Sequence, residues 1–161
     1  APRGAAAVGT LVFGTRHINC AQGTVDRILH DALPILQDQI RTQLSTSLIG
    51  VVAQTLVPRI GGGRCAAYEV LIISPGIANL IRENKTFRIN SAIQTGAKFG
   101  MQLMDDALFK LWKADMVTVE DILAKAQNPD DLAKKIVNAK RLMADEAEES
   151  DGDEEDEAGI G

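Results

Sequence analysis

The chain has 161 residues, of which 45 % are hydrophobic, and its formal net charge of −5 is unevenly distributed. Ten acidic residues and no basic one lie between Asp145 and Glu157, so the rest of the chain sets 12 acids against all 17 Lys and Arg, a balance of +5. This length predicts one domain with a sizeable core. The basic residues are scattered among few aromatic ones, which argues against a nucleic-acid-binding protein.

The first part of the chain is predicted to mix strands and helices. An apolar run before Gly14 predicts a buried strand over Thr10–Thr15. A polar loop over residues 16–24 and a helix over residues 24–32 follow. Residues 37–54 are predicted to form a long helix, because one stripe at helical spacing is apolar: Ile40, Leu44, Leu48, Val51 and Val52. The run Gly61-Gly62-Gly63 then separates two apolar stretches, residues 55–60 and 64–73, and predicts a β-hairpin.

After residue 74 the pattern is helical throughout. Ser74-Pro75 is a helix-start signature, since Ser can cap a helix and Pro is tolerated at the first helical position. The helix that follows is amphipathic, with Ile77, Leu80 and Ile81 on its apolar face and Asn79, Arg82 and Glu83 pointing elsewhere. Four further helices are predicted. The first is capped by Asn90 or Ser91 and ends at Gly96, and the second carries on one face Met101, Met104, Leu108, Leu111 and Trp112. The third starts with a capping box of Thr118 and Asp121, and the fourth starts at Asn128-Pro129-Asp130-Asp131.

The acidic block at residues 145–161 is predicted to be disordered, because dense like charge repels itself and buries no apolar area. Whether it is only solvated or docks on a partner stays open. Cys20 and Cys65 have no metal-site or disulfide spacing and fit a reducing cytoplasm. No signal peptide and no apolar run long enough for a transmembrane segment is recognised.

Several of these segments resemble one known family. The string Gly76-Ile77-Ala78-Asn79-Leu80-Ile81-Arg82-Glu83 is similar to the AIRNLIRE helix of the type IV pilus retraction ATPases, the PilT or twitching motility family, with Gly76 in place of Ala and Ala78 in place of Arg. Residues 10–19 resemble the family's His box, GTLHTN, although Arg16 and Ile18 depart from it. The order and spacing of such segments agree over residues 9–136, except that residues 31–36 are unusually apolar.

The resemblance implies an α/β fold that is the C-terminal portion of a RecA-like P-loop ATPase core. Residues 1–73 would be a partial core with the His box and hairpin, residues 74–144 a helical C-terminal region with the retraction helix, and residues 145–161 the acidic tail. No G-x-x-x-x-G-K-[ST] loop occurs in the sequence. The family's Walker A loop, Asp box and Walker B segment lie upstream of the His box, so this chain is expected to be part of a longer ATPase and inactive in ATP hydrolysis by itself.

The resemblance also implies roles for particular residues. His17 falls on the His-box histidine, which implies contact near the γ-phosphate of ATP, and Thr15 and Asn19 match the same box. Arg27 is either a phosphate or interface contact or an ordinary helix-surface residue. The retraction helix is represented by Ile77, Asn79, Leu80, Ile81, Arg82 and Glu83. No metal ligand is predicted, and His30 matches no family motif and is predicted to lie at the surface.

The parent protein is expected to bind ATP and Mg, with most phosphate and Mg ligands outside this chain. The resemblance further implies a homo-hexamer that works with an inner-membrane pilus platform protein, in the cytoplasm at the inner face of the inner membrane. Two alternatives stay open. One is an assembly ATPase of pili or type II secretion, although such relatives usually carry a four-Cys metal site that this sequence lacks. The other is a non-enzymatic remnant that docks on intact ATPase subunits.

Overall fold

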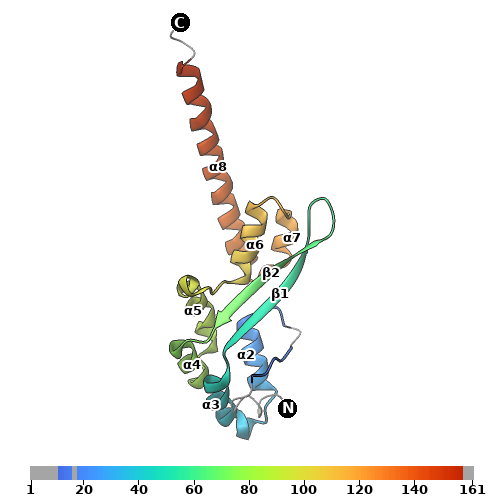
Figure 1. Cartoon of the computed structure of the whole chain (residues 1–161), viewed down its shortest axis with the longest axis vertical. Helices are drawn as coiled ribbons and strands as arrows, with labels where there is room; N and C mark the ends of the chain where they lie inside the picture. The colour runs from blue at the N-terminus through green and yellow to red at the C-terminus, as the bar shows by residue number, and fades with distance from the viewer. Residues whose placement is uncertain (1–10, 16–17, 158–161) are drawn as a thin grey trace.

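The computed structural model describes residues 11–15 and 18–157, with side chains described as far as Ala144. The elements in chain order are α2 (Ala21–His30), the 3₁₀ turn η1 (Pro34–Leu36), α3 (Gln37–Ser47), β1 (Gly50–Pro58), β2 (Arg64–Ile72), α4 (Pro75–Arg82), η2 (Thr86–Arg88), α5 (Ile89–Thr95), η3 (Ala97–Phe99), α6 (Met104–Lys113), α7 (Val119–Leu123) and α8 (Pro129–Glu157). Figure 1 shows α3, α4 and α5 near the open end of the β1–β2 hairpin and α7 near its turn.

The antiparallel hairpin runs in register from the pair Gly50↔Ile72 to the pair Pro58↔Arg64. Its turn contains Gly61–Gly63, whose φ angles of 87°, 107° and 80° lie in the left-handed region that glycine adopts without a steric penalty. The predicted hairpin around the glycine run is therefore confirmed, although β1 begins at Gly50 and not at residue 55.

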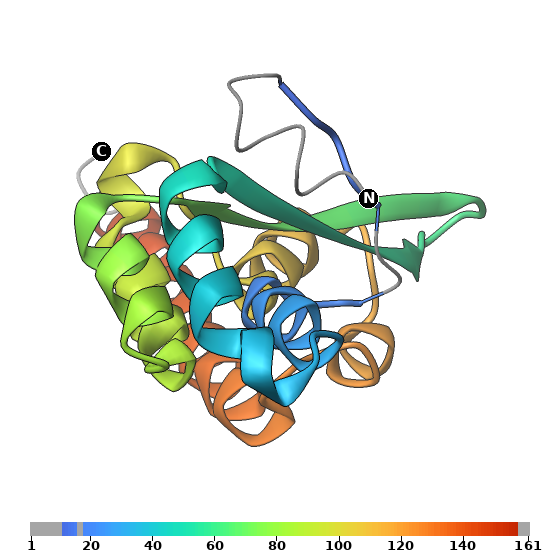
Figure 2. The same ribbon diagram turned by 90° about the horizontal axis from the view of Figure 1, so that it is seen from below.

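Helices cover one face of this hairpin, as the view from below shows (Figure 2). Successive strand residues point to opposite faces, so one set of side chains is buried under the helices: Ala53, Val57, Ala67, Glu69 and Leu71. They enter two apolar clusters. The first joins Ala53, Val57 and Ala67 to α6, α7 and α8. The second joins Leu71 to α2, α4 and α5. The hairpin thus spans both clusters.

The long helix predicted over residues 37–54 is wrong in its second half. The helix α3 ends at Ser47, Leu48 already has an extended backbone with ψ 126°, and β1 begins at Gly50. Val51 and Val52, which fit the helical stripe, are β-branched and pair with Leu71 and Val70 of β2. Residues 51 and 52 fit the apolar spacing of a helix and also the alternation of a strand, and pairing with β2 makes them a strand.

The strand predicted over residues 10–15 is also not found where the structure describes it. Residues 11–15 have no regular secondary structure, and the side chains of Leu11 and Phe13 are 68 % and 88 % exposed. A strand needs a neighbour to satisfy its backbone N–H and C=O groups. Within the described residues the sheet has two strands, β1 and β2, and neither pairs with this segment.

The acidic block at residues 145–157 lies within the last described helix, and its predicted disorder stays a prediction. The helix α8 continues through it to Glu157 and projects away from the body (Figure 1). Its first turns are anchored by the buried side chains of Leu132 and Ile136. A helix that is already nucleated extends at little cost through residues such as Glu and Ala, which have high helix propensity.

Most predicted helix boundaries after residue 74 are confirmed. The Ser74 hydroxyl caps α4 by accepting from the Ile77 amide at 3.4 Å, and the Thr118 hydroxyl caps α7 by accepting from the Asp121 amide at 3.2 Å. Gly96 ends α5 as predicted, but α5 begins at Ile89, so neither Asn90 nor Ser91 is its cap. The helix α6 begins at Met104 and does not include Met101.

Candidate functional site

The helix α4 is held by its apolar face and presents its polar face to solvent. Ile77 and Ile81 are buried in the second cluster, and Leu80 is half-buried. Asn79, Arg82 and Glu83 are exposed. Of the six residues predicted for the retraction helix, the structure therefore gives two a role in the core and leaves three polar ones available for contact.

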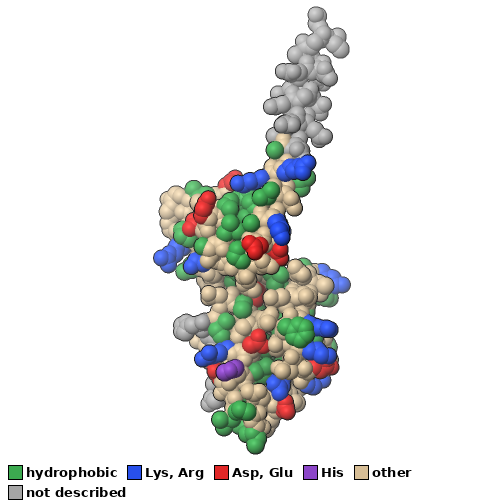
Figure 3. Space-filling view, turned by 180° about the vertical axis from the view of Figure 1, so that it is seen from behind, with side chains coloured by type: hydrophobic (Ala, Val, Ile, Leu, Met, Phe, Trp, Pro, Cys, Tyr) green, Lys and Arg blue, Asp and Glu red, His purple; other side chains and the backbone are tan. Residues whose placement is uncertain are grey.

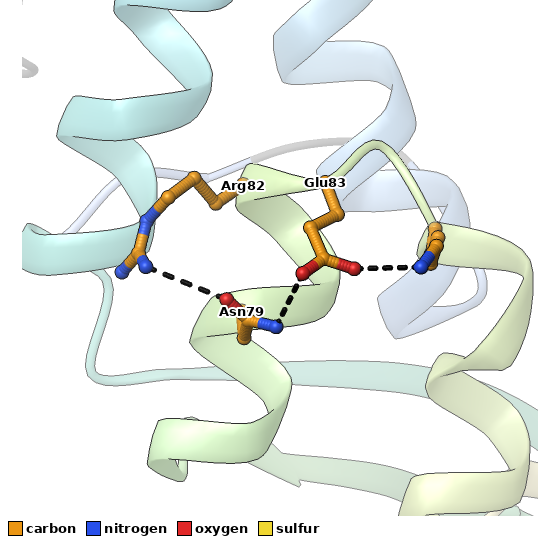
Figure 4. A network of polar contacts seen from close by, with 4 residues as sticks. Asn79, Arg82 and Glu83 are labelled. Atoms are coloured by element: carbon orange, nitrogen blue, oxygen red, sulfur yellow. Dashed lines mark hydrogen bonds and ion pairs between the residues drawn. The ribbon is translucent and has the colours of Figure 1, made fainter.

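The exposed residues of α4 form one chain of polar contacts (Figure 4). Arg82 Nη1 donates to Asn79 Oδ1 at 3.4 Å, and Asn79 Nδ2 donates to Glu83 Oε1 at 2.7 Å. Lys85 Nζ donates to the other Glu83 oxygen, Oε2, at 2.7 Å. Lys85 was not among the predicted residues. Its signal was a basic residue two positions after the acidic C-cap, Glu83, of an amphipathic helix.

The carboxylate of Glu83 is stabilised in its charged form by this arrangement. The hydrogen bond from Lys85, followed by that from Asn79 and the charge of Lys85, lowers the pKa of Glu83 below its ordinary value of 4.5. The surface of α4 therefore carries a fixed negative oxygen pair between two cationic side chains, Arg82 and Lys85. Such an alternating pattern suits recognition of a complementary polar protein surface.

The predicted nucleotide-side residues lie before and within α2. His17 and its neighbour Arg16 lie outside the described residues. Thr15 and Asn19 are exposed and lie in irregular backbone on either side of them. Arg27 is 62 % exposed, and its Nε forms an ion pair with Asp31 Oδ1 at 3.0 Å, one helical turn further along. Both predicted roles of Arg27, a phosphate or interface contact and an ordinary helix-surface residue, therefore stay predictions.

The start of α2 is fixed by two groups that the sequence analysis did not single out. The Cys20 thiol caps the helix by accepting from the Gly23 amide at 3.3 Å. Burial, partly opposed by this bond, raises the pKa of the Cys20 thiol above its ordinary value of 9.0. The second group is the buried carboxylate of Glu69, which lies at the first amide of α2.

Two further surface features concern predicted residues. The remaining histidine, His30, is exposed as predicted and is visible on the face drawn in Figure 3. The unusually apolar segment around η1 is exposed too, in its side chains Leu33, Ile35 and Leu36. The unusually apolar residues 33, 35 and 36 therefore lie at the surface and outside the two buried clusters.

Neither a metal-binding cluster nor a membrane-spanning helix is found among the described residues. No three His, Cys, Asp or Glu side chains in the described part of the chain converge so that they could hold a metal ion. Among the described helices, none combines the length and the apolarity that a membrane span requires.

The chain is similar in sequence to known proteins. The chain is 45 % identical over 127 residues to the "Type IV pilus retractation ATPase PilT" of Pseudomonas aeruginosa, covering 78 % of this chain and 37 % of that protein. It is 44 % identical over 131 residues to a "Twitching motility protein" of Neisseria gonorrhoeae, covering 80 % of this chain and 35 % of that protein. No protein-family model matches the chain.

A solved structure agrees as well. The pilus retraction motor PilT with bound ADP superposes with a TM-score of 0.72 at 40 % identity, covering 81 % of this chain and 38 % of that structure. The present chain thus spans less than two fifths of the length of these relatives. In sequence and in fold, the chain is similar to the PilT-type ATPases of type IV pilus retraction, and its structure fits the C-terminal part of their fold.

Proposed function

We propose that this chain is the coupling portion of an ATP-driven motor that retracts type IV pili. The observation that carries the proposal is the organisation of α4. The match to PilT is accompanied by a helix whose isoleucines are buried in the core, while Asn79, Arg82 and Glu83 form a linked polar surface. Such a helix can transmit movement of the domain to a partner surface without changing its own packing.

In this proposal the nucleotide is held mainly by the part of the motor that lies before the segment that this chain matches. Phosphoryl transfer relies on positioning and charge stabilisation by a phosphate-binding loop and Mg. His17, with Thr15 and Asn19, contributes a sensor near the γ-phosphate, and an imidazole can bond a phosphate oxygen or a water there. The motor is a homo-hexamer that acts on an inner-membrane pilus platform protein from the cytoplasmic face.

The proposal is tested by grafting. Residues 11–144 replace the matching segment of Pseudomonas aeruginosa PilT, and twitching is measured in a strain without its own PilT. We expect the chimera to restore twitching, and the same chimera with Asn79→Ala, Arg82→Ala and Glu83→Ala to assemble and hydrolyse ATP but not to restore it. The control is Lys113→Ala, an exposed position in the last turn of α6. A chimera that hydrolyses ATP and leaves twitching absent, or a triple variant that twitches normally, would overturn the proposal.

The dependence on the rest of the motor is tested directly. The purified 161-residue chain is expected to show no ATP hydrolysis above a buffer blank under conditions in which full-length PilT is active. Turnover by this chain that scales with its concentration, and that survives a second purification step, would show that it holds a complete nucleotide site.

A further inference from the structure

A single buried carboxylate connects three segments that are distant in sequence. Glu69 lies in the middle of β2, and its exposed fraction is 0 %. A buried carboxylate is costly unless its charge is met by hydrogen bonds or an opposite charge. Among the ion pairs of the described residues, none involves Glu69.

Three N–H groups meet that charge instead. The Ala21 amide donates to Oε1 at 2.5 Å, and the Met104 amide donates to Oε2 at 3.1 Å. Gln127 Nε2 donates to the same Oε2 at 2.6 Å. Ala21 and Met104 are the first residues of α2 and α6. Both helices thus begin on one carboxylate, where their N-terminal N–H groups and dipoles favour negative charge.

The position of this carboxylate along the chain gives it a link to the candidate site. Asn19 and Cys20 lie directly before Ala21, so the bond from the Ala21 amide fixes the backbone next to Asn19, a residue of the predicted His box. Met104 and Gln127 belong to the helical region. Charge-assisted hydrogen bonds are about twice as strong as neutral ones, so Asn19 and Cys20 cannot shift relative to α6 without breaking one of the stronger polar contacts in the core.

We propose that Glu69 is a positioning residue that holds Asn19 and Cys20, directly before α2, in a fixed relation to the helical C-terminal region. Its significance for the motor rests on the proposed function, because only there does the His box sense the nucleotide and the helical region move a partner. The tie itself is a property of this chain and can be measured on it.

The test is amide NMR and hydrogen exchange on the full 161-residue chain. Glu69→Gln keeps the shape of the side chain and removes its charge. We expect the amide protons of Ala21 and Met104 to move upfield together, and exchange of the Ala21 amide to become at least about tenfold faster, which corresponds to about 1.4 kcal/mol. We also expect the signals of Ile18 and Asn19 to move.

A matched control separates this tie from general destabilisation. Thr118→Ala removes the cap of α7, which lies in the same helical region and does not touch Glu69. We expect it to leave the signals of Ile18 and Asn19 and the exchange of Ala21 unchanged. Unchanged Ala21 exchange in Glu69→Gln, or equal changes in Thr118→Ala, would overturn the inference.

Should Glu69→Gln fail to fold, the unmodified chain supplies the measurement. Scalar couplings across the hydrogen bonds, from the amide nitrogens of Ala21 and Met104 to Glu69 Cδ, are expected for both bonds. Their absence would overturn the tie while leaving the proposed function intact. A chimera that fails to twitch while both couplings are present would count against the proposed function alone.

Discussion

Replacing Ile81 with alanine is expected to separate the packing role of α4 from the role of its exposed surface. The Ile81 side chain is 0 % exposed and lies in the second cluster. The substitution removes three carbon atoms, worth about 0.8 kcal/mol each in transfer free energy. The cavity left behind raises the total loss of unfolding free energy to about 3–4 kcal/mol, within the range measured for such core truncations.

The assay is urea denaturation followed by far-UV circular dichroism. With a denaturant slope of about 2 kcal/mol per molar urea, the midpoint should fall by about 1.5–2 M. Fluorescence of the single Trp112 reports on the first cluster, which Ile81 does not enter. If the hairpin makes both clusters one cooperative unit, the fluorescence midpoint falls by the same amount.

The matched control is Arg82→Ala, the neighbouring exposed position, which should change the unfolding free energy by no more than about 0.5 kcal/mol. A loss below about 1 kcal/mol for Ile81→Ala would refute the reasoning. So would an Arg82→Ala variant that loses as much as Ile81→Ala, because α4 would then not be anchored by its isoleucines.

Three further outcomes are expected. Gly96→Ala should destabilise the chain by about 1–3 kcal/mol, because a Cβ there would lie 2.6 Å from the sulfur of the buried Met101 and 3.0 Å from the backbone oxygen of Ala92. Gly76→Ala, whose Cβ would meet nothing closer than 3.9 Å, should be neutral or stabilising. Equal thermal midpoints for the two variants would contradict this. The raised pKa of Cys20 leaves less thiolate at neutral pH, so iodoacetamide should alkylate it more slowly than it alkylates free cysteine, and an equal or faster rate in mass spectrometry would count against its burial. Because the pKa of Glu83 is lowered, its ionised side chain contributes to stability above pH 4.5, and this contribution is lost as the pH falls through the pKa of the folded state. A titration of the Glu83 carboxyl carbon with a midpoint at or above 4.5 would disprove the contact with Lys85.

The sequence predicted the elements whose signals are local. The glycine run gives the hairpin turn, Ser74-Pro75 gives the start of α4, and Thr118 with Asp121 gives the start of α7, since each of these is decided within a few residues. The family resemblance, carried by short strings, is supported by relatives and by a solved fold.

The predictions that failed depend on partners distant in the chain. Val51 and Val52 fit a helix until they are paired with β2, and Leu11–Phe13 fit a buried strand only if another strand lies beside them. Glu69 was missed for the same reason, because its donors come from residues 21, 104 and 127. A lone acid in an apolar strand was the one signal of its burial.

The order in which these contacts close has a kinetic consequence. The hairpin joins neighbouring residues over a short turn, whereas the bonds of the β2 carboxylate span 48, 35 and 58 positions along the chain. Closing longer loops costs more chain entropy, and contacts made after the rate-limiting barrier act mainly on the reverse reaction. Neutralising Glu69 should therefore increase the unfolding rate and leave the refolding rate almost unchanged.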